Sequence, residues 1–384
     1  MKHNKLLLGG MILAHILFFL SFFLLFNMYK NKASEPLSEK PSQLQAEKHL
    51  AIRAKGLNVQ TTLAAIGDIL IHDRVYENAK IKSSYDFHPM FQMIQSSLKK
   101  PDILLANQET ILGGVKLGLS SYPCFNSPQQ VGNALIDSGV DIVSTANNHA
   151  LDRGEKGLIT SINYLNKLNL PHVGTYTSQK SHDTLQILSS NGIKIAYLSY
   201  TYGTNGIPIP KGKDFLVNLI DKTKMKEEIQ RAKKKADVVV MSVHWGIEYQ
   251  RFPNKEQKQL ASFLVNQGVD IIFGHHPHVL QPMAWIKAKD GRKALVVYSL
   301  GNFLSGQDRD YKDIGGMASV QITKKVSQEG KIISLNSPTF LPTYVSHSHD
   351  QYRVVPLKNA GPYGLMNASE KYNEIMNHMT HHLK

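Results

Sequence analysis

Side chains that can bind a metal ion or move a proton follow six apolar runs of the chain. They are Asp68, Asn107, Glu109, Asn147, Asn148, His149, Asp152, His244, His275, His276, His278 and Asn302. One histidine after a strand is an ordinary surface residue, but six polar clusters in such positions indicate a shared site. Imidazole, carboxylate and amide groups supply the nitrogen and oxygen ligands of zinc, manganese and iron. The set therefore predicts a divalent-metal site, with enough ligands for two ions.

The single cysteine narrows the chemistry further. Cys124 stands alone among 384 residues, so no disulfide can form within the chain. The paired-cysteine spacing of thiolate zinc sites is absent as well. Any bound metal must therefore use oxygen and nitrogen ligands.

The polar clusters need strands to position them, and the sequence predicts these strands. From Thr61 onward, apolar runs alternate with amphipathic stretches, which is typical of an α/β architecture. Predicted strands cover residues 62–66, 103–106, 141–144, 193–200, 238–243, 270–273 and 294–298. Predicted helices cover 87–100, 154–169, 224–236 and 255–268. Beyond about residue 320 the pattern favours a β-hairpin and then a helix over 368–381.

Two segments share one pattern, "LIDSGVDIVSTANNH" and "LVNQGVDIIFGHHPH". Each reads as a helix end, a glycine suited to a helix C-cap, a short strand and a polar cluster. Both clusters would lie just beyond the carboxyl end of a strand, where open α/β sheets bind their ligands.

The first 60 residues differ from the rest. The segment from Leu6 to Phe26 has no Asp, Glu, Lys or Arg and is long enough to cross a bilayer. It exceeds the apolar core of about 7–15 residues in a secretory signal. We therefore expect a transmembrane signal-anchor in residues 1–30 and an extracellular tether in 31–60. The protein would cross the cell membrane once, with the bulk of the chain outside. A cleaved signal, with "NKAS" as a weak cleavage site, is the alternative.

The ordered motifs "GDI", "NQE", "ANNHALDRG", "VHWGIEY", "GHHPH" and "YSLGNF" resemble the CapA family, also called the PgsA type. Its members are capsule and poly-γ-glutamate synthesis proteins, related in fold to calcineurin-like metallophosphoesterases. The resemblance spans about Leu63 to Ser305. It implies an α/β fold with a two-sheet αββα sandwich in residues 61–345, followed by a C-terminal extension in 346–384. It also implies a site for two divalent ions, Mn, Zn or Fe, on the strand-end loops.

The resemblance assigns ligands to both ions. Asp68 and His278 would bind the first ion, and the second would be held by Asn148, His244 and His276. "HPH" would correspond to the "HxH" pair of phosphoesterases, because alternate residues of an extended loop can point the same way.

Further roles follow from the same resemblance. Glu109 would take the place of the bridging carboxylate, with Asn107 nearby, and His149 would act as a general acid or stabilise developing charge. Asp152 is either a second catalytic residue or a partner of Arg153 in a loop ion pair.

Two departures from the phosphoesterase pattern bear on the first ion. That pattern opens with Asp-x-His, whereas "DIL" follows here and His72 comes two positions too late. Its second motif carries an aspartate where this chain has "NQE". A single strongly bound ion, or a site used on something other than phosphate esters, therefore stays open.

Three functions are compatible with the sequence. The first is a membrane-anchored component of poly-γ-glutamate synthesis or export, with an acidic polymer and other membrane subunits of a polymer synthase as partners. The second is a free-standing metal-dependent hydrolase of phosphate esters or γ-glutamyl amides, and the third is a non-catalytic polyanion-binding scaffold. The net charge of +14 suits an acidic polymer, although the lysines are dispersed except at Lys233–Lys235. No basic stretch interleaved with aromatic residues indicates nucleic-acid binding.

Overall fold

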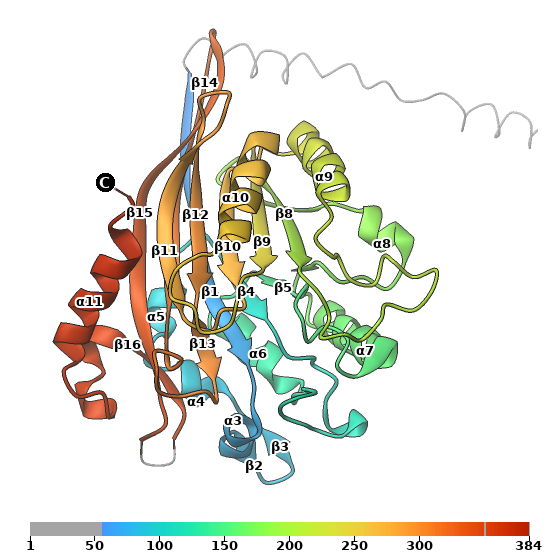
Figure 1. The fold of residues 1–384 in the computed structure, drawn as a ribbon, viewed down its shortest axis with the longest axis vertical. Coiled ribbons are helices and arrows are strands. Elements are labelled where there is room, and N and C mark those ends of the chain that lie inside the picture. Colours follow the sequence, from blue (N-terminus) through green and yellow to red (C-terminus); the bar gives the residue numbers. More distant parts are fainter. Residues whose placement is uncertain (1–55, 349–350, 384) are drawn as a thin grey trace, which may run out of the picture. The chain divides into compact units, whose positions relative to one another are not determined.

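Two β-sheets stacked face to face form the centre of the structure, a computed structural model that describes residues 56–348 and 351–383 (Figure 1). The strand order of the first sheet is β16-β15-β14-β1-β4-β5-β6, with β13 paired to β1. Its strands are β1 (Leu57–Leu70), β4 (Ile103–Gln108), β5 (Ile142–Ser144), β6 (His172–Val173), β13 (Asn302–Ser305), β14 (Ile314–Ser327), β15 (Gly330–Ser346) and β16 (Arg353–Pro356).

The second sheet has the strand order β11-β12-β10-β9-β8-β7. Its strands are β7 (Gln186–Ser190), β8 (Ile193–Thr201), β9 (Val238–His244), β10 (Ile271–His275), β11 (Leu280–Lys287) and β12 (Lys293–Leu300). A short separate hairpin joins β2 (Lys80–Ile81) to β3 (Ser84–Tyr85).

Side-chain alternation along β1 explains the layered arrangement. Leu63 and Ala65 pack against the second sheet, whereas Ala64 and Ile66 pack against helices on the opposite face. Successive side chains of a strand point to opposite faces, so a strand buried on both faces must be apolar throughout. The continuous apolar runs of the sequence are therefore the strands of a sandwich covered by helices on both sides.

Helices cover both outer faces of this sandwich (Figure 1). Near the first sheet are α3 (Asp73–Asn78), α4 (His88–Phe91), α5 (Gln95–Leu98), α6 (Gln130–Asp137) and α7 (Gly154–Lys167). The second sheet is covered by α9 (Lys222–Lys235) and α10 (Lys255–Gln267), while α8 (Gln179–Asp183) precedes β7. The last helix is α11 (Ala368–Thr380).

The seven predicted strands are all present, and four of the five predicted helices match α7, α9, α10 and α11. The helix predicted over 87–100 is instead divided into α4 and α5, with Ile94 at φ −110° between them. Single helical turns are not stable alone in water. Burial of Phe91, Ile94 and Leu98 in the core holds these two in place.

The strand register aligns the polar clusters at one edge of the sandwich. In the first sheet, Asp68 pairs with Asn107 on one side and with Asn302 on the other. In the second sheet, His244 pairs with His275 and with Thr201. Since the strands concerned run parallel, their carboxyl ends meet, as the sequence predicts.

The segment after residue 345 is part of the same compact unit, which spans residues 57–384. Strand β16 extends the first sheet, and Ile375 and Met379 of α11 are buried in the core between the sheets. The predicted signal-anchor and nearly all of the predicted tether lie outside the described residues. Within residues 56–348 and 351–383, no helix is both long and apolar enough to span a membrane.

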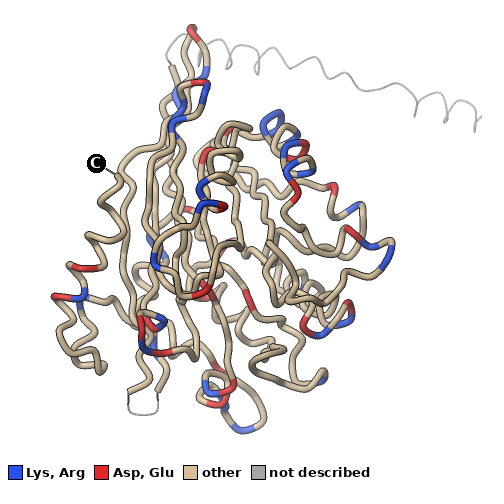
Figure 2. The backbone as a smooth tube through the Cα atoms, in the orientation of Figure 1, with Lys and Arg blue, Asp and Glu red and all other residues tan. Residues whose placement is uncertain are grey.

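Charged residues are spread over the unit rather than gathered on one face (Figure 2). Basic residues group on α9 and near the tip of the β14–β15 hairpin, where acidic residues accompany them. This agrees with the dispersed lysines of the sequence.

Candidate metal centre

Three ligand candidates of the first sheet form one hydrogen-bonded group. The Asn107 side-chain amide donates to Asp68 Oδ1 at 2.9 Å and to Glu109 Oε2 at 3.3 Å. Asn107 Oδ1 in turn accepts from the Ser144 hydroxyl at 3.1 Å. All three side chains are buried. Asn107 therefore fixes the two carboxylates and leaves their remaining oxygens directed elsewhere.

The histidines of the second sheet face these carboxylates. His278 Nδ1 lies 3.1 Å from Asp68 Oδ2, and His275 Nδ1 lies 3.3 Å from Asp68 Oδ1. His244 Nε2 lies 3.4 Å from Glu109 Oε1 and 2.8 Å from Asn148 Oδ1. The two sheets thus contribute opposite walls of one buried polar site.

The loop that carries His276 and His278 is not extended, contrary to the sequence-based expectation. His276 has φ 96° and His278 has φ 57°, so both occupy left-handed backbone. Such conformations cost a non-glycine residue about 1–3 kcal/mol and are concentrated at functional sites. The two rings therefore converge because of tight turns of the chain, and not through simple alternation.

Close backbone packing supports this loop. A Cβ atom on Gly274, just before His275, would lie 2.0 Å from the Tyr298 carbonyl oxygen. Glycine is therefore required where β10 passes β12, and it sets the direction in which the histidine loop leaves the sheet.

Two sets of ligand atoms lie close enough to hold ions. Glu109, His276 and His278 form one set, and Asp68, Glu109 and His244 form the other; within each set the ligand atoms lie within 4.8 Å of one another. Glu109 belongs to both sets, which suits the bridging role that the family resemblance implies. His276 is grouped with His278, whereas that resemblance grouped it with His244, so the division of ligands between two ions stays a prediction.

The buried charges are poorly balanced by the protein alone. Burial and the charge of Asp68 raise the pKa of Glu109 to about 8. Burial raises the pKa of Asp68, but the hydrogen bond from His278 and the nearby imidazoles of His275 and His278 outweigh burial and hold that pKa well below its usual range. Burial also lowers the pKa of His276 to about 2 and lowers that of His244. Burial lowers the pKa of His278, but the charges of Glu109 and Asp68 outweigh burial and raise that pKa to about 9. Metal ligands require ionised carboxylates and neutral imidazoles, so an ion would displace the protons of Glu109 and His278.

Several buried atoms of the site lack a hydrogen-bond partner among the described residues. These buried atoms are Glu109 Oε1, His244 Nδ1, His276 Nδ1 and both ring nitrogens of His275. Buried polar atoms are normally satisfied, so a group of orphaned atoms needs an explanation. A divalent cation fits this donor set of imidazole nitrogens and carboxylate oxygens.

His149 and Asp152 form a separate pair beside the ligands. His149 Nδ1 lies 2.7 Å from Asp152 Oδ2, which also accepts from the Phe125 backbone N–H at 2.6 Å. The Phe125 ring contacts the His149 ring edge-on at 4.7 Å between centroids. The pair is thus held in one orientation, and the predicted ion pair between Asp152 and Arg153 does not form: Arg153 instead donates to the carbonyls of Leu117 and Gly118.

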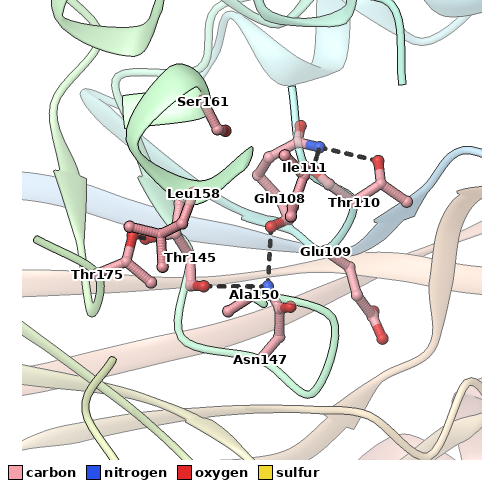
Figure 3. Close-up of a pocket in the computed structure, with 10 residues that line it drawn as sticks. All are labelled: Gln108, Glu109, Thr110, Ile111, Thr145, Asn147, Ala150, Leu158, Ser161 and Thr175. Atoms are coloured by element: carbon pink, nitrogen blue, oxygen red, sulfur yellow. Dashed lines mark hydrogen bonds between the residues drawn. The ribbon is translucent and has the colours of Figure 1, made fainter. Parts of the chain in front are cut away.

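A small cavity of about 20 Å³ lies behind Glu109 (Figure 3). Asn147 donates there to the carbonyls of Gln108 and Thr145, while the Glu109 carboxylate points away from the other labelled side chains. The cavity has room for about one water molecule. Asn147 is therefore a positioning residue that ties the end of β4 to the loop that carries Asn148.

Some contributors are not predicted from the sequence. Asn205 Oδ1 accepts from the Asn148 side chain at 3.2 Å, and its amide lies 3.4 Å from His149 Nδ1. The polar run "TYGTNG" directly after β8 is the signal that could have identified it. Asn302, which the sequence does place among the polar clusters, lies 3.1 Å from His278 Nδ1. His72 is not in either ligand set; its Nδ1 accepts from the Gly306 N–H.

Two tyrosines border the ligand histidines. The Tyr202 ring lies 4.6 Å from the His276 ring, and the Tyr249 ring lies 6.2 Å from that of His278. Burial and the Glu248 charge raise the pKa of each tyrosine to about 12. Both phenols are therefore neutral and able to donate hydrogen bonds at physiological pH.

Comparison with the sequence profiles of known families shows to which family this chain belongs. The family described as "Bacterial capsule synthesis protein PGA_cap" matches residues 62–307, well over half of the chain. The chain belongs to this family. The match includes every predicted site residue, the whole second sheet and the strands of the first sheet that carry site residues, so the site described above lies wholly within the family's domain.

Relatives in the family support the same conclusion. The chain is 28% identical over 310 residues to "Capsule biosynthesis protein CapA" of Bacillus anthracis, covering 77% of this chain and 72% of that protein. It is 32% identical over 256 residues to "PGA biosynthesis protein CapA" of Bacillus subtilis, covering 63% of this chain and 62% of that protein. The chain thus matches less than two thirds of the B. subtilis protein.

Solved structures give distant matches. The calcineurin-like phosphoesterase YfkN of B. subtilis aligns with a TM-score of 0.47 and 17% identity, covering 74% of this chain and 91% of that structure. The NAD nucleotidase NadN of Haemophilus influenzae aligns with a TM-score of 0.46 and 13% identity, covering 84% of this chain and 57% of that one.

Proposed function

We propose that this protein is a membrane-anchored, extracellular component of poly-γ-glutamate capsule synthesis or export, with a divalent-metal centre of the metallophosphoesterase type. The observation that carries the metal centre is the convergence of Asp68, Glu109, His244, His276 and His278, with orphaned atoms on Glu109, His244 and His276. Family membership supports the capsule role, since both Bacillus relatives are described as biosynthesis proteins of a capsule or of PGA. An acidic polymer and other membrane subunits are the proposed partners.

The proposed chemistry divides tasks among the residues. A divalent ion held by the ligand sets around Glu109 would supply Lewis-acid polarisation of the bond to be broken. Asn107 holds the carboxylates of Asp68 and Glu109 in position. His149, oriented by Asp152, holds or delivers a proton at its other ring nitrogen, Nε2. Burial of the ligands excludes bulk water from this group.

A hydrolase that acts on its own is the second candidate function. The His149–Asp152 pair favours it, because a pure binding site has no need for an oriented imidazole beside the ligands. Phosphate esters and γ-glutamyl amides are the two substrate classes to screen. A scaffold that binds polymer without turnover would keep the metal and show no activity on either class.

Metal analysis of the purified full-length protein tests the proposal. We expect two equivalents of Mn, Zn or Fe in the wild type, and loss of both in a His276→Ala, His278→Ala double variant. A His381→Ala, His382→Ala double variant is the matched control, because these exposed histidines lie beyond α11 and outside both ligand sets. Failure of the wild type to bind metal after reconstitution would overturn the metal centre.

A further inference from the structure

The two tyrosines beside the ligand histidines are half exposed, whereas the ligands themselves are buried. Tyr202 keeps 48% and Tyr249 keeps 47% of its surface exposed, although each ring lies against a ligand histidine. A molecule that approaches the metal centre from solvent on this side must therefore meet the two phenol rings before it reaches the histidines.

Backbone hydrogen bonds fix the positions of these two tyrosines. The Tyr202 N–H donates to the His244 carbonyl at 3.0 Å, and the Tyr249 N–H donates to the Pro277 carbonyl at 2.8 Å. Tyr249 also adopts left-handed backbone, with φ 66°. Each tyrosine is thus fixed to the chain segment that carries a ligand, and a strained conformation is retained for a half-exposed ring.

A cation lies on the Tyr249 side of this entrance. Lys312 Nζ is 5.3 Å from the centre of the Tyr249 ring, and Gln307 donates to the Tyr249 hydroxyl at 3.2 Å. The nearest carboxylate partner of Lys312 is that of the exposed Asp310, at 3.7 Å, a weak surface pair that a ligand can replace. Glu248 acts on both tyrosines by its charge, so it disfavours a ligand carboxylate except close to Lys312.

These groups select a particular chemistry. Aromatic faces bind planar groups, and phenol hydroxyls donate to carbonyl oxygens. An ammonium beside them binds a carboxylate. A polymer of planar amides that carries a carboxylate on each repeat can bind to the aromatic faces, the phenol hydroxyls and the ammonium group. We propose that Tyr202, Tyr249 and Lys312 form a subsite that holds the amide and carboxylate groups of an acidic polyamide chain beside the metal centre. This inference rests on the proposed function and names its substrate-binding residues.

Calorimetric titration of the Mn-loaded full-length protein with γ-linked glutamate decamer tests the subsite. Tyr202→Ala and Tyr249→Ala should each weaken binding about three- to tenfold. Lys312→Ala should weaken it too, with an effect that shrinks at high salt. Metal content should not change in any of these variants. Tyr363→Ala and Lys358→Ala are matched controls on the segment between β16 and α11, and should bind as the wild type does.

The outcomes separate the subsite from the function. Wild-type affinity in a Tyr202→Ala, Tyr249→Ala double variant would overturn the subsite and leave the proposed function standing. No decamer binding by the wild type would overturn both the subsite and the polymer as ligand. Binding of a dinucleotide in place of the decamer, lost in the same variants, would replace the polyamide with a phosphodiester and overturn the inference.

Discussion

His149 and Asp152, the two predicted catalytic residues, belong to neither set of ligand atoms. Their contact at 2.7 Å, fixed by the Phe125 N–H, is the arrangement of a general acid and the group that orients it. Asp152 Oδ1 is buried and has no hydrogen-bond partner among the described residues. In the proposed function we therefore assign the pair to the chemistry beside the metal and not to the binding of the metal.

Replacing Asp152 with Asn tests this role. The amide keeps the shape of the side chain but replaces the carboxylate beside His149 Nδ1 with a neutral group. We expect Mn content to stay at the wild-type level and turnover of a hydrolysable phosphodiester or γ-glutamyl probe to fall roughly 10²-fold or more. Asp290→Asn, at an exposed ion pair with Arg292, is the control. Unchanged turnover would exclude the pair from the chemistry, and lost metal would make Asp152 a support for the ligands.

At the scale of elements, the sequence predicts what depends on local pattern. The strands that carry the ligands have continuous apolar runs, and the polar cluster after each run marks its end, so Asp68, Glu109, His244, His276 and His278 are all identified. Features that depend on tertiary contacts could not be predicted from the sequence. The left-handed backbone of His276 and His278 depends on packing of β10 against β12, and the contact of Asn205 with His149 joins residues 56 positions apart.

Another tertiary contact of this kind links the two sheets at the amino end of β9. The Asp237 carboxylate, only 8% exposed, accepts from the Lys194 N–H, from Lys324 Nζ of β14 at 2.8 Å and from Lys331 Nζ of β15 at 2.7 Å. Burial raises its pKa, but the backbone hydrogen bond and the two lysines outweigh burial and lower it below 3.8. The ionised carboxylate thus joins the second sheet to the long hairpin of the first.

The sign of the pH dependence follows from that depressed pKa. The ionised form stabilises the fold above the ordinary pKa, and this stabilisation is lost as the pH falls through the lower folded value. We expect Asp237→Asn to reduce the free energy of unfolding by about 1–3 kcal/mol at pH 7. Urea unfolding at pH 7, 4 and 3 should show the difference shrinking toward acid. A constant difference, or one as small as that of the exposed Asp310→Asn control, would contradict this role.

For the whole molecule, the C-terminal segment determines how much of the chain folds as one unit. Ile375 and Met379 of α11 are fully buried against the core between the sheets, and Glu374 pairs with Arg251 from the loop after β9. His378 Nε2 also lies 3.0 Å from the carbonyl oxygen of Leu280, two residues after His278. The helix therefore packs against the part of the sandwich near the loops that follow His244 and His278.

Truncation of one buried side chain measures this contribution. Ile375→Ala should lower the free energy of unfolding by about 2–5 kcal/mol, because it removes buried methyl groups and leaves a cavity. Glu370→Ala on the exposed face of the same helix should change it by less than about 0.5 kcal/mol. A single cooperative transition is expected in both variants. A small loss for Ile375→Ala, or a separate early transition, would make α11 an appendage to the fold.

Metal binding should stabilise the whole unit, because the ligands extend from Asp68 to His278 and meet only in the folded chain. An ion at a hundred times its dissociation constant raises the free energy of unfolding by about 2.7 kcal/mol. We expect Mn or Zn to raise the melting temperature of the wild type and a chelator to reverse the shift. Acidification should weaken the effect, since protons compete for the imidazoles and carboxylates. The His276→Ala, His278→Ala variant should show no shift. An equal shift in that variant would mean that the ion stabilises the protein elsewhere, and loss of the shift on replacing His381 and His382 would locate it at the chain end.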